Sequence, residues 1–196
     1  MEQEFSERQI QIFNASIKLI GKGGIQLLTT KNLAVEIGLS EAAIYKHFTS
    51  KVDILKGLLT FLKTPIIKKL EKIAKSKKTP TEKLKQLFIE HSKAFTERPE
   101  IAVVLLSEGL YQYEKELSDI VFALMQESKV FYQMIIEEGQ QTGVFKKNID
   151  SKQLTFIIMG SLRFNVIQWH LSGFKMNLSE NHSKLFDTIG DLILNK

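Results

Sequence analysis

The sequence predicts an all-α protein of nine helices. Apolar residues recur at helical spacing along most of its 196 residues, and only 3 prolines interrupt them. No segment alternates apolar and polar residues as a half-buried strand would. No internal repeat or low-complexity tract suggests a solenoid or a disordered chain. A helical protein with one or two compact domains is therefore expected from this length.

The first helix is predicted from an apolar face made by Ile10, Phe13, Ile17 and Ile20. It ends near the glycine-rich stretch 21–24. Residues 29–48 then favour two short helices joined at Gly38, because glycine suits the left-handed conformation that ends a helix. Thr30 is a good N-cap for the first of the pair, and Ser40 for the second. A pair of this kind can place its second helix in a DNA major groove.

A fourth helix begins with Ser50 and Asp53, which resemble a capping box. Pro65 interrupts its apolar pattern, so we expect a kink or a break there, with Thr64 able to cap a second segment. The lysine-rich stretch 63–78 that follows contains a single acid, Glu71. This stretch suits either extra phosphate contacts or a solvated helix end and linker.

The remaining helices are placed by their caps and breakers. Thr79, Pro80 and Glu82 together form a strong start for the fifth helix. The others follow in order: a short sixth from Pro99 to about Ser107, a long seventh from Gly109 to Thr142 with Gly143 as its C-cap, an eighth from Asp150 to about Leu171, and a ninth from Ser179 to Asn195.

The charge is unevenly distributed. Residues 1–80 hold 14 Lys and Arg against 7 Asp and Glu, whereas residues 81–196 hold 13 against 15. A basic first part and a nearly neutral remainder fit DNA binding at one end, although lysine-rich surfaces are also common without it. The chain has no cysteine, no apolar run near 20 residues and an acidic, polar start. These features exclude disulfides and thiolate metal sites, and we expect a cytoplasmic protein without a membrane partner.

Residues 39–55, Leu-Ser-Glu-Ala-Ala-Ile-Tyr-Lys-His-Phe-Thr-Ser-Lys-Val-Asp-Ile-Leu, resemble the TetR family of bacterial transcriptional regulators. The Tyr-x-His-Phe-x-x-Lys core of that family is present as Tyr45, His47, Phe48 and Lys51. The resemblance covers about residues 6–66. It implies three helices for a DNA-binding domain at 6–66, with the helix-turn-helix motif at 29–48, and six helices for a ligand-binding and dimerisation domain at 67–196.

The resemblance also implies DNA contacts. Thr30 and Lys51 match phosphate-contacting positions, while Tyr45 and His47 match positions that pack on the DNA backbone. The full set of candidate DNA-binding residues is Thr30, Lys31, Ser40, Ala42, Ala43, Tyr45, Lys46, His47 and Lys51. Lys46 is best able to donate to guanine O6 and N7. The alternatives are core packing for Tyr45 and ordinary solvation for the lysines. Because Ala42 and Ala43 carry no hydrogen-bonding group, operator shape should supply part of the specificity.

Two further sets of candidate residues, for ligand binding and for dimerisation, lie in the second domain, except for Phe61 near the end of the first. The candidate ligand pocket comprises Phe61, Phe88, His91, Phe95, Leu106, Leu110, Met125, Tyr132 and Trp169. Each could equally be plain core, and His91 could be solvent-facing or hydrogen-bonded within the fold. The candidate dimer interface comprises Leu154, Ile158, Ser161, Leu162, Asn165, Leu185, Ile189 and Leu192.

No catalytic or metal-binding pattern is present, since the four histidines are widely spaced and no glycine-rich phosphate loop occurs. We therefore expect no enzyme and no cofactor. The prediction is a homodimeric repressor that binds a pseudo-palindromic operator in double-stranded DNA and is released by an unknown small lipophilic ligand. The alternative is an architectural, nucleoid-associated scaffold of the same fold, with a protein partner and no small-molecule inducer.

Overall fold

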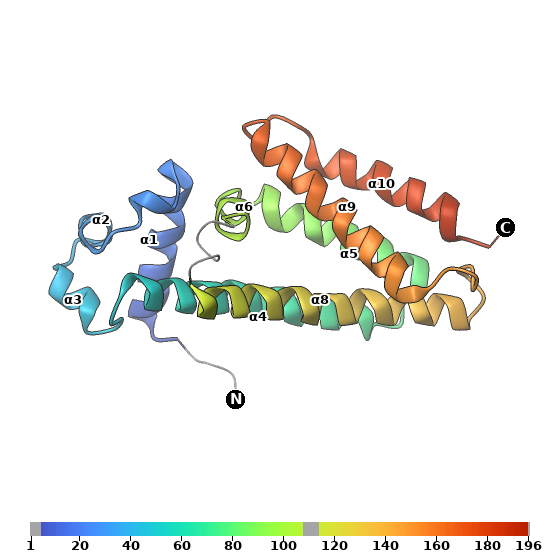
Figure 1. The fold of residues 1–196 in the computed structure, drawn as a ribbon, viewed down its shortest axis with the longest axis horizontal. Coiled ribbons are helices and arrows are strands. Elements are labelled where there is room, and N and C mark those ends of the chain that lie inside the picture. The colour runs from blue at the N-terminus through green and yellow to red at the C-terminus, as the bar shows by residue number, and fades with distance from the viewer. Residues whose placement is uncertain (1–4, 108–113, 196) are drawn as a thin grey trace. The chain divides into compact units, whose positions relative to one another are not determined.

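The structure is a computed structural model that describes residues 5–107 and 114–195. Those ranges contain nine α-helices, a short 3-10 helix and one isolated β-bridge between Phe145 and Leu194 (Figure 1). The elements are α1 (Glu7–Gly23), η1 (Ile25–Leu27), α2 (Thr30–Ile37), α3 (Glu41–Tyr45), α4 (Lys51–Ala74), α5 (Pro80–Thr96), α6 (Glu100–Leu105), α8 (Lys115–Gln141), α9 (Ser151–Leu171) and α10 (Leu178–Ile193). The all-α prediction is confirmed.

Capping signals located several helix ends correctly. Asp150 caps α9 by accepting from the Gln153 backbone N–H at 2.9 Å. Gly143 has φ 76° just after α8, as the predicted C-cap requires. Two starts were wrong by one residue: Thr29 rather than Thr30 caps α2, and α10 begins at Leu178 rather than Ser179. The predicted start of the seventh helix at Gly109 lies outside the described residues.

Pro65 does not break the fourth helix. Helix α4 runs from Lys51 to Ala74 with Pro65 inside it. Thr64 does not cap a second segment; its hydroxyl donates to the Thr60 carbonyl at 3.1 Å. Pro65 is exposed, so its ring needs no space in the core. The cost is confined to the Phe61 carbonyl, which loses its usual intrahelical donor because proline has no N–H.

The chain forms two compact units, each with its own interior. The first contains α1, η1, α2, α3 and α6, with α4 up to Pro65 and α8 up to Ala123. The second contains α5, α9 and α10, with the remaining parts of α4 and α8. Residues 100–123, which the sequence-based division assigned to the second domain, thus belong to the first unit.

Aromatic rings fill the interior of the first unit. The Phe13 ring lies 5.4 Å from Phe48 and 5.3 Å from Phe61, measured between ring centroids. Helix α4 comes close to these rings at Gly57, where a Cβ atom would lie 2.7 Å from Cζ of Phe13. Only glycine therefore allows this approach without displacing a ring.

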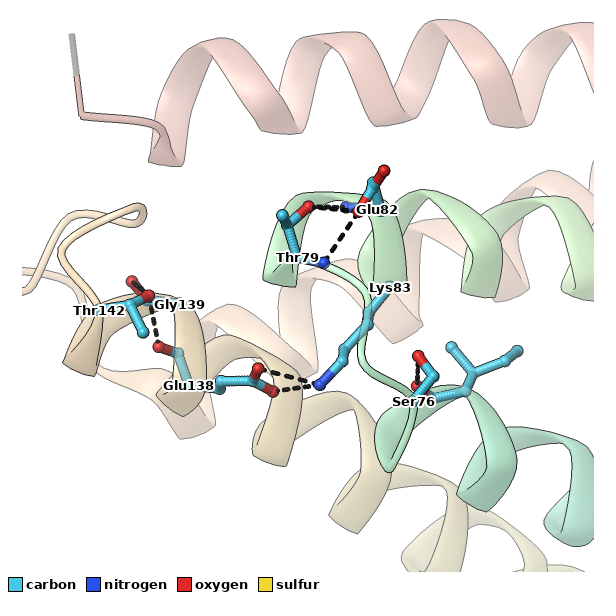
Figure 2. Close-up of polar contacts among 8 residues, drawn as sticks. Ser76, Thr79, Glu82, Lys83, Glu138, Gly139 and Thr142 are labelled. Atoms are coloured by element: carbon cyan, nitrogen blue, oxygen red, sulfur yellow. Dashed lines mark hydrogen bonds and ion pairs between the residues drawn. The ribbon is translucent and has the colours of Figure 1, made fainter.

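The second unit combines an apolar core with a partly buried ion pair. Its core includes Phe88, Tyr132 and Phe145, with the inward faces of α9 and α10. Figure 2 shows the polar contacts where α5 begins. Thr79 and Glu82 form the predicted capping box, and Lys83 donates to both carboxylate oxygens of Glu138 at 2.9 and 2.7 Å. This pair joins α5 to α8.

Candidate DNA-binding site

The helix-turn-helix is built from α2, a tight turn and α3. Thr29 accepts from the Asn32 N–H at 3.1 Å to cap α2, and Ser40 accepts from the Ala43 N–H at 3.2 Å to cap α3. Gly38 ends α2 with φ 68° and ψ 36°, the left-handed conformation predicted for it. Helix α3 is shorter than predicted because it ends at Tyr45. Figure 1 shows α1, α2 and α3 close together in this unit.

Apolar side chains fix α3 against the rest of the first unit. Ile44 and Leu33 are fully buried, and Phe48 is nearly so. Phe48 packs on Phe13 of α1, so the end of α3 is anchored to the aromatic interior. These burials match the inward face expected from the spacing of Ile44 and Phe48.

The opposite side of the motif is exposed. Tyr45 is 52% exposed, which disfavours the alternative of core packing. Ser40, Ala42 and His47 are also exposed, and Ala43 is half-buried. Lys46 follows the last helical residue with φ −68° and ψ −21°, so it still has helical geometry. Neither Lys31 nor Lys46 forms an ion pair within the described ranges, and both are exposed. Lys31 and Lys46 therefore lie on the exposed side of the motif, together with the exposed carboxylate of Glu41.

Besides Ser40, two of the candidate residues have side-chain partners inside the protein. The Lys51 ammonium donates to the Ile25 carbonyl at 3.2 Å and thereby ties the start of α4 to η1. The Thr30 hydroxyl donates to the Glu41 carboxylate at 2.6 Å and joins the first residues of α2 and α3. The sequence pattern did not indicate this pair, because the two residues are 11 positions apart and belong to different helices.

Other lysines of this unit are neutralised locally. Lys18 and Lys22 of α1 both pair with Glu36 of α2. Their hydrogen bonds hold the pKa of the Glu36 carboxyl below its ordinary value, with Lys18 contributing most. Lys56 pairs with Glu116 of α8. The two lysines of α1 are therefore paired within the unit, whereas Lys31 and Lys46 of the helix-turn-helix are not.

The candidate pocket residues are divided between the units. Phe61 and Leu106 belong to the first unit, and Leu110 lies outside the described residues. In the second unit Phe88 and Tyr132 are buried, with burial raising the pKa of Tyr132. Trp169 is buried too, whereas Met125 is 44% exposed. A cleft of about 300 Å³ between α5 and α10 includes Phe88 but is otherwise lined by residues not predicted, among them Lys85, Ser92, His182 and Phe186.

His91 is hydrogen-bonded within the second unit. Its Nδ1 lies 3.1 Å from Nε2 of His182, and Nδ1 of His182 lies 2.8 Å from the Leu178 carbonyl oxygen. Because a carbonyl can only accept, His182 carries its proton on Nδ1 and accepts at Nε2 from His91. Burial lowers the pKa of His91 to about 3 and also lowers the pKa of His182. Phe95 packs on the His91 ring at 5.1 Å.

The candidate dimer residues fall on two different faces. Four of them, Leu154, Ile158, Leu162 and Ile189, are buried in the core of their own chain and are not available to a second copy. Ser161, Asn165 and Leu185 line a groove of about 480 Å³ between α9 and α10, and Leu192 is 58% exposed. Large apolar side chains that periodicity did not single out extend this face: Phe156, Phe164 and Leu171 are 72%, 57% and 78% exposed.

Two family models match successive parts of the chain. A family model described as "Bacterial regulatory proteins, tetR family" matches residues 12–58, which contain the helix-turn-helix. A second model, described as "YsiA-like protein, C-terminal region", matches residues 62–194. Within the described ranges no cluster of three or more metal-ligating side chains occurs, and none of the helices there is long and apolar enough to span a membrane.

Individual relatives are distant but match over most of their length. The chain is 26% identical to the nucleoid occlusion factor SlmA of Vibrio atlanticus over 178 residues, covering 90% of both chains. It is 25% identical to the fatty acid metabolism regulator protein of Bacillus subtilis over 189 residues, covering 96% of this chain and 97% of that one. The fold is similar to the crystal structure of the Bacillus subtilis regulator FadR in complex with stearoyl-CoA, with TM-score 0.81, 24% identity and coverage of 92% and 96%.

Proposed function

Because this chain belongs to the tetR family of bacterial regulatory proteins, it is a DNA-binding transcriptional regulator and not an enzyme, and we propose that it is a repressor released from its operator by a long-chain acyl-CoA. The exposed side of the helix-turn-helix, where Lys31 and Lys46 form no ion pair within the described residues, supports operator binding most directly. We place its action in the bacterial cytoplasm, where its operator would be found.

In the proposed DNA complex, α3 enters the major groove and the start of α2 meets the backbone. Lys46 donates to guanine O6 and N7, and Lys31 meets phosphate. Lys51 reaches phosphate by exchanging the Ile25 carbonyl for a phosphate oxygen. Thr30 meets phosphate through its backbone N–H at the start of α2, while its hydroxyl stays on the Glu41 carboxylate. Tyr45 and His47 pack on the sugar-phosphate chain. Ser40, Ala42 and Ala43 allow close approach of the helix start, and groove shape supplies further discrimination.

We propose that two copies associate through α9 and α10 as an isologous four-helix bundle. The exposed face of α9, with Phe156, Phe164 and Leu171, supports this arrangement because isolated monomers rarely leave so many large apolar side chains in water. Gly160 in the groove between α9 and α10 has nothing within 4 Å of a built Cβ, so a partner helix can approach there. Two-fold symmetry implies half-sites about 10 bp apart, or a multiple of that spacing.

The proposed ligand follows from two similarities. The fatty acid metabolism regulator of Bacillus subtilis aligns over nearly the whole chain, and the FadR structure contains stearoyl-CoA. In this chain the second unit offers the apolar, aromatic interior that an acyl chain would need. Helix α4 belongs to both units, so a ligand that favours one conformation of α4 can lower operator affinity. The ligand must bind that conformation more tightly than the other.

The similarity to SlmA supports a second candidate function, a nucleoid-associated scaffold that binds DNA and a protein partner without an inducer. The two proposals differ in their response to acyl-CoA. A repressor of the proposed kind gains thermal stability with stearoyl-CoA and releases DNA, whereas a scaffold of the second kind does neither. Free CoA and free stearate serve as controls for the separate parts of the ligand.

Titrations of operator DNA test the proposed docking. Lys46→Ala should change sequence preference at one position of each half-site, by about 1–3 kcal/mol. Lys51→Ala should weaken all sequences alike and reduce the slope of log affinity against log salt by about one unit. Lys75→Ala is the matched control, because Lys75 is exposed just after the end of α4 and pairs with Glu71. If Lys46→Ala and Lys51→Ala both behave as this control does, the docking proposal is wrong.

A further inference from the structure

The helix-turn-helix carries an acidic side chain in an unexpected place. Glu41 is the first residue of α3 and is exposed. It forms no ion pair within residues 5–107 and 114–195, and its one side-chain partner there is the Thr30 hydroxyl at 2.6 Å. Glu36, the other acid of the motif, is by contrast engaged by Lys18 and Lys22. A free carboxylate on a surface that faces DNA costs affinity unless it meets a donor.

We propose that Glu41, oriented by Thr30, is a specificity-determining residue that accepts a hydrogen bond from the exocyclic amino group of a base, with cytosine preferred. This inference rests on the proposed binding of α3 in the major groove. It adds a base contact at the start of α3, where Ala42 and Ala43 provide none.

Neither residue of the pair is needed to cap its helix. Thr29 caps α2 through the Asn32 N–H, and Ser40 caps α3 through the Ala43 N–H. The Thr30 hydroxyl and the Glu41 carboxylate are therefore additional to the local structure of the motif. The hydrogen bond between them fixes a long side chain that would otherwise move freely, and so lowers the entropy lost when the carboxylate contacts a base.

The chemistry of the carboxylate selects the base. Thr30 donates to Oε2 of Glu41, which leaves Oε1 as an acceptor directed by that bond. An ionised carboxylate can only accept. In the major groove the donors are the amino groups of cytosine and adenine, and adenine also presents the N7 acceptor beside its amino group. Repulsion from N7 favours cytosine over adenine, and repulsion from the guanine and thymine acceptors lowers affinity where those bases take its place.

The test compares the base preferences of the full-length protein and its variants. Each protein selects duplexes from a randomised pool, and its affinities are then measured on single duplexes. Glu41→Ala should lose cytosine preference at one position of each half-site by about 5- to 150-fold, and should bind random DNA more tightly. Glu41→Gln should move that preference towards adenine, because an amide can pair with both N6 and N7. Thr30→Val should keep the cytosine preference but weaken it by about 2- to 10-fold.

Glu7→Gln is the matched control, because Glu7 is an exposed carboxylate in the first turn of α1 and the substitution removes the same charge. A second measurement replaces the selected cytosine with a pyrimidine that lacks the amino group. The wild-type protein should lose affinity for this duplex, whereas Glu41→Ala should not. If the wild type selects an operator but all Glu41 variants share its preferences, this inference is overturned. If the wild type selects no sequence, the proposed function fails instead.

Discussion

The ion pair between Lys83 and Glu138 predicts that its two partners respond unequally to substitution. The Lys83 side chain is 5% exposed and the Glu138 side chain 39%. Glu138→Gln leaves a buried ammonium without a counter-charge, although the amide oxygen can still accept one hydrogen bond. Removing one partner of a buried pair costs about 3–5 kcal/mol. Since water can reach the Glu138 side of this pair, we expect about 2–4 kcal/mol.

Lys83→Met instead removes the buried charge and keeps an apolar stem of similar length. The Glu138 carboxylate is then hydrated through its exposed side, so we expect a cost of about 0–1.5 kcal/mol. Glu71→Gln provides a surface control, because Glu71 and Lys75 are 44% and 64% exposed. Its expected cost is about 0–0.5 kcal/mol.

Urea unfolding at one fixed protein concentration measures these differences. The single tryptophan of the sequence, Trp169, is buried in the second unit, so its fluorescence reports the unit that contains the pair. A fixed concentration matters because dimerisation would add to the apparent stability. If Lys83→Met costs as much as Glu138→Gln, the reasoning from buried charge is refuted.

Four further outcomes are expected. Gly57→Ala should destabilise the protein by about 1–3 kcal/mol in urea because its Cβ would meet Phe13 at 2.7 Å; Gly190→Ala, with an ordinary 3.6 Å contact, should be neutral or slightly stabilising. Burial lowers the pKa of His91 to about 3 and the pKa of His182 below its ordinary value. As the pH falls, these histidines are therefore protonated in the unfolded chain before they are protonated in the folded one. The free energy of unfolding of the wild type should decrease as the pH drops below about 6.5. The decrease should be smaller in His91→Gln, and an equal decrease in the two proteins would contradict this reasoning. Phe164→Glu should shift sedimentation at micromolar concentration from dimer to monomer, whereas Glu180→Gln on the exposed surface should not. Acyl-CoA affinity measured with and without operator DNA gives the coupling between the two ligands. Pro65→Ala should change this coupling more than it changes the acyl-CoA affinity in the absence of DNA. An unchanged coupling would mean that Pro65 has a structural role only.

Local signals in the sequence predicted most helix ends. The caps at Thr79 and Asp150 and the left-handed Gly38 depend on neighbours within four residues, so the sequence contains all that determines them. The local cost of Pro65 alone predicts a kink or a break in the fourth helix. The chain tolerates that cost because Pro65 faces solvent while Leu62 and Leu70, on either side, are buried.

Features that depend on distant partners could not be predicted in this way. Periodicity shows that one face of α9 is apolar, but it does not show whether Leu154 and Ile158 face the chain's own core or a second copy. The bond between His91 and His182 joins residues 91 positions apart. The hydrogen bond between Thr30 and Glu41 likewise depends on the packing of α2 against α3.

Selection of bacterial genomic fragments by the purified full-length protein, followed by sequencing, tests the central claim most directly. The account predicts one recurrent inverted repeat, with half-sites about 10 bp apart or a multiple of it, whose recovery falls when stearoyl-CoA is added and not when free CoA is added. Recovery of fragments without any shared sequence would contradict the account.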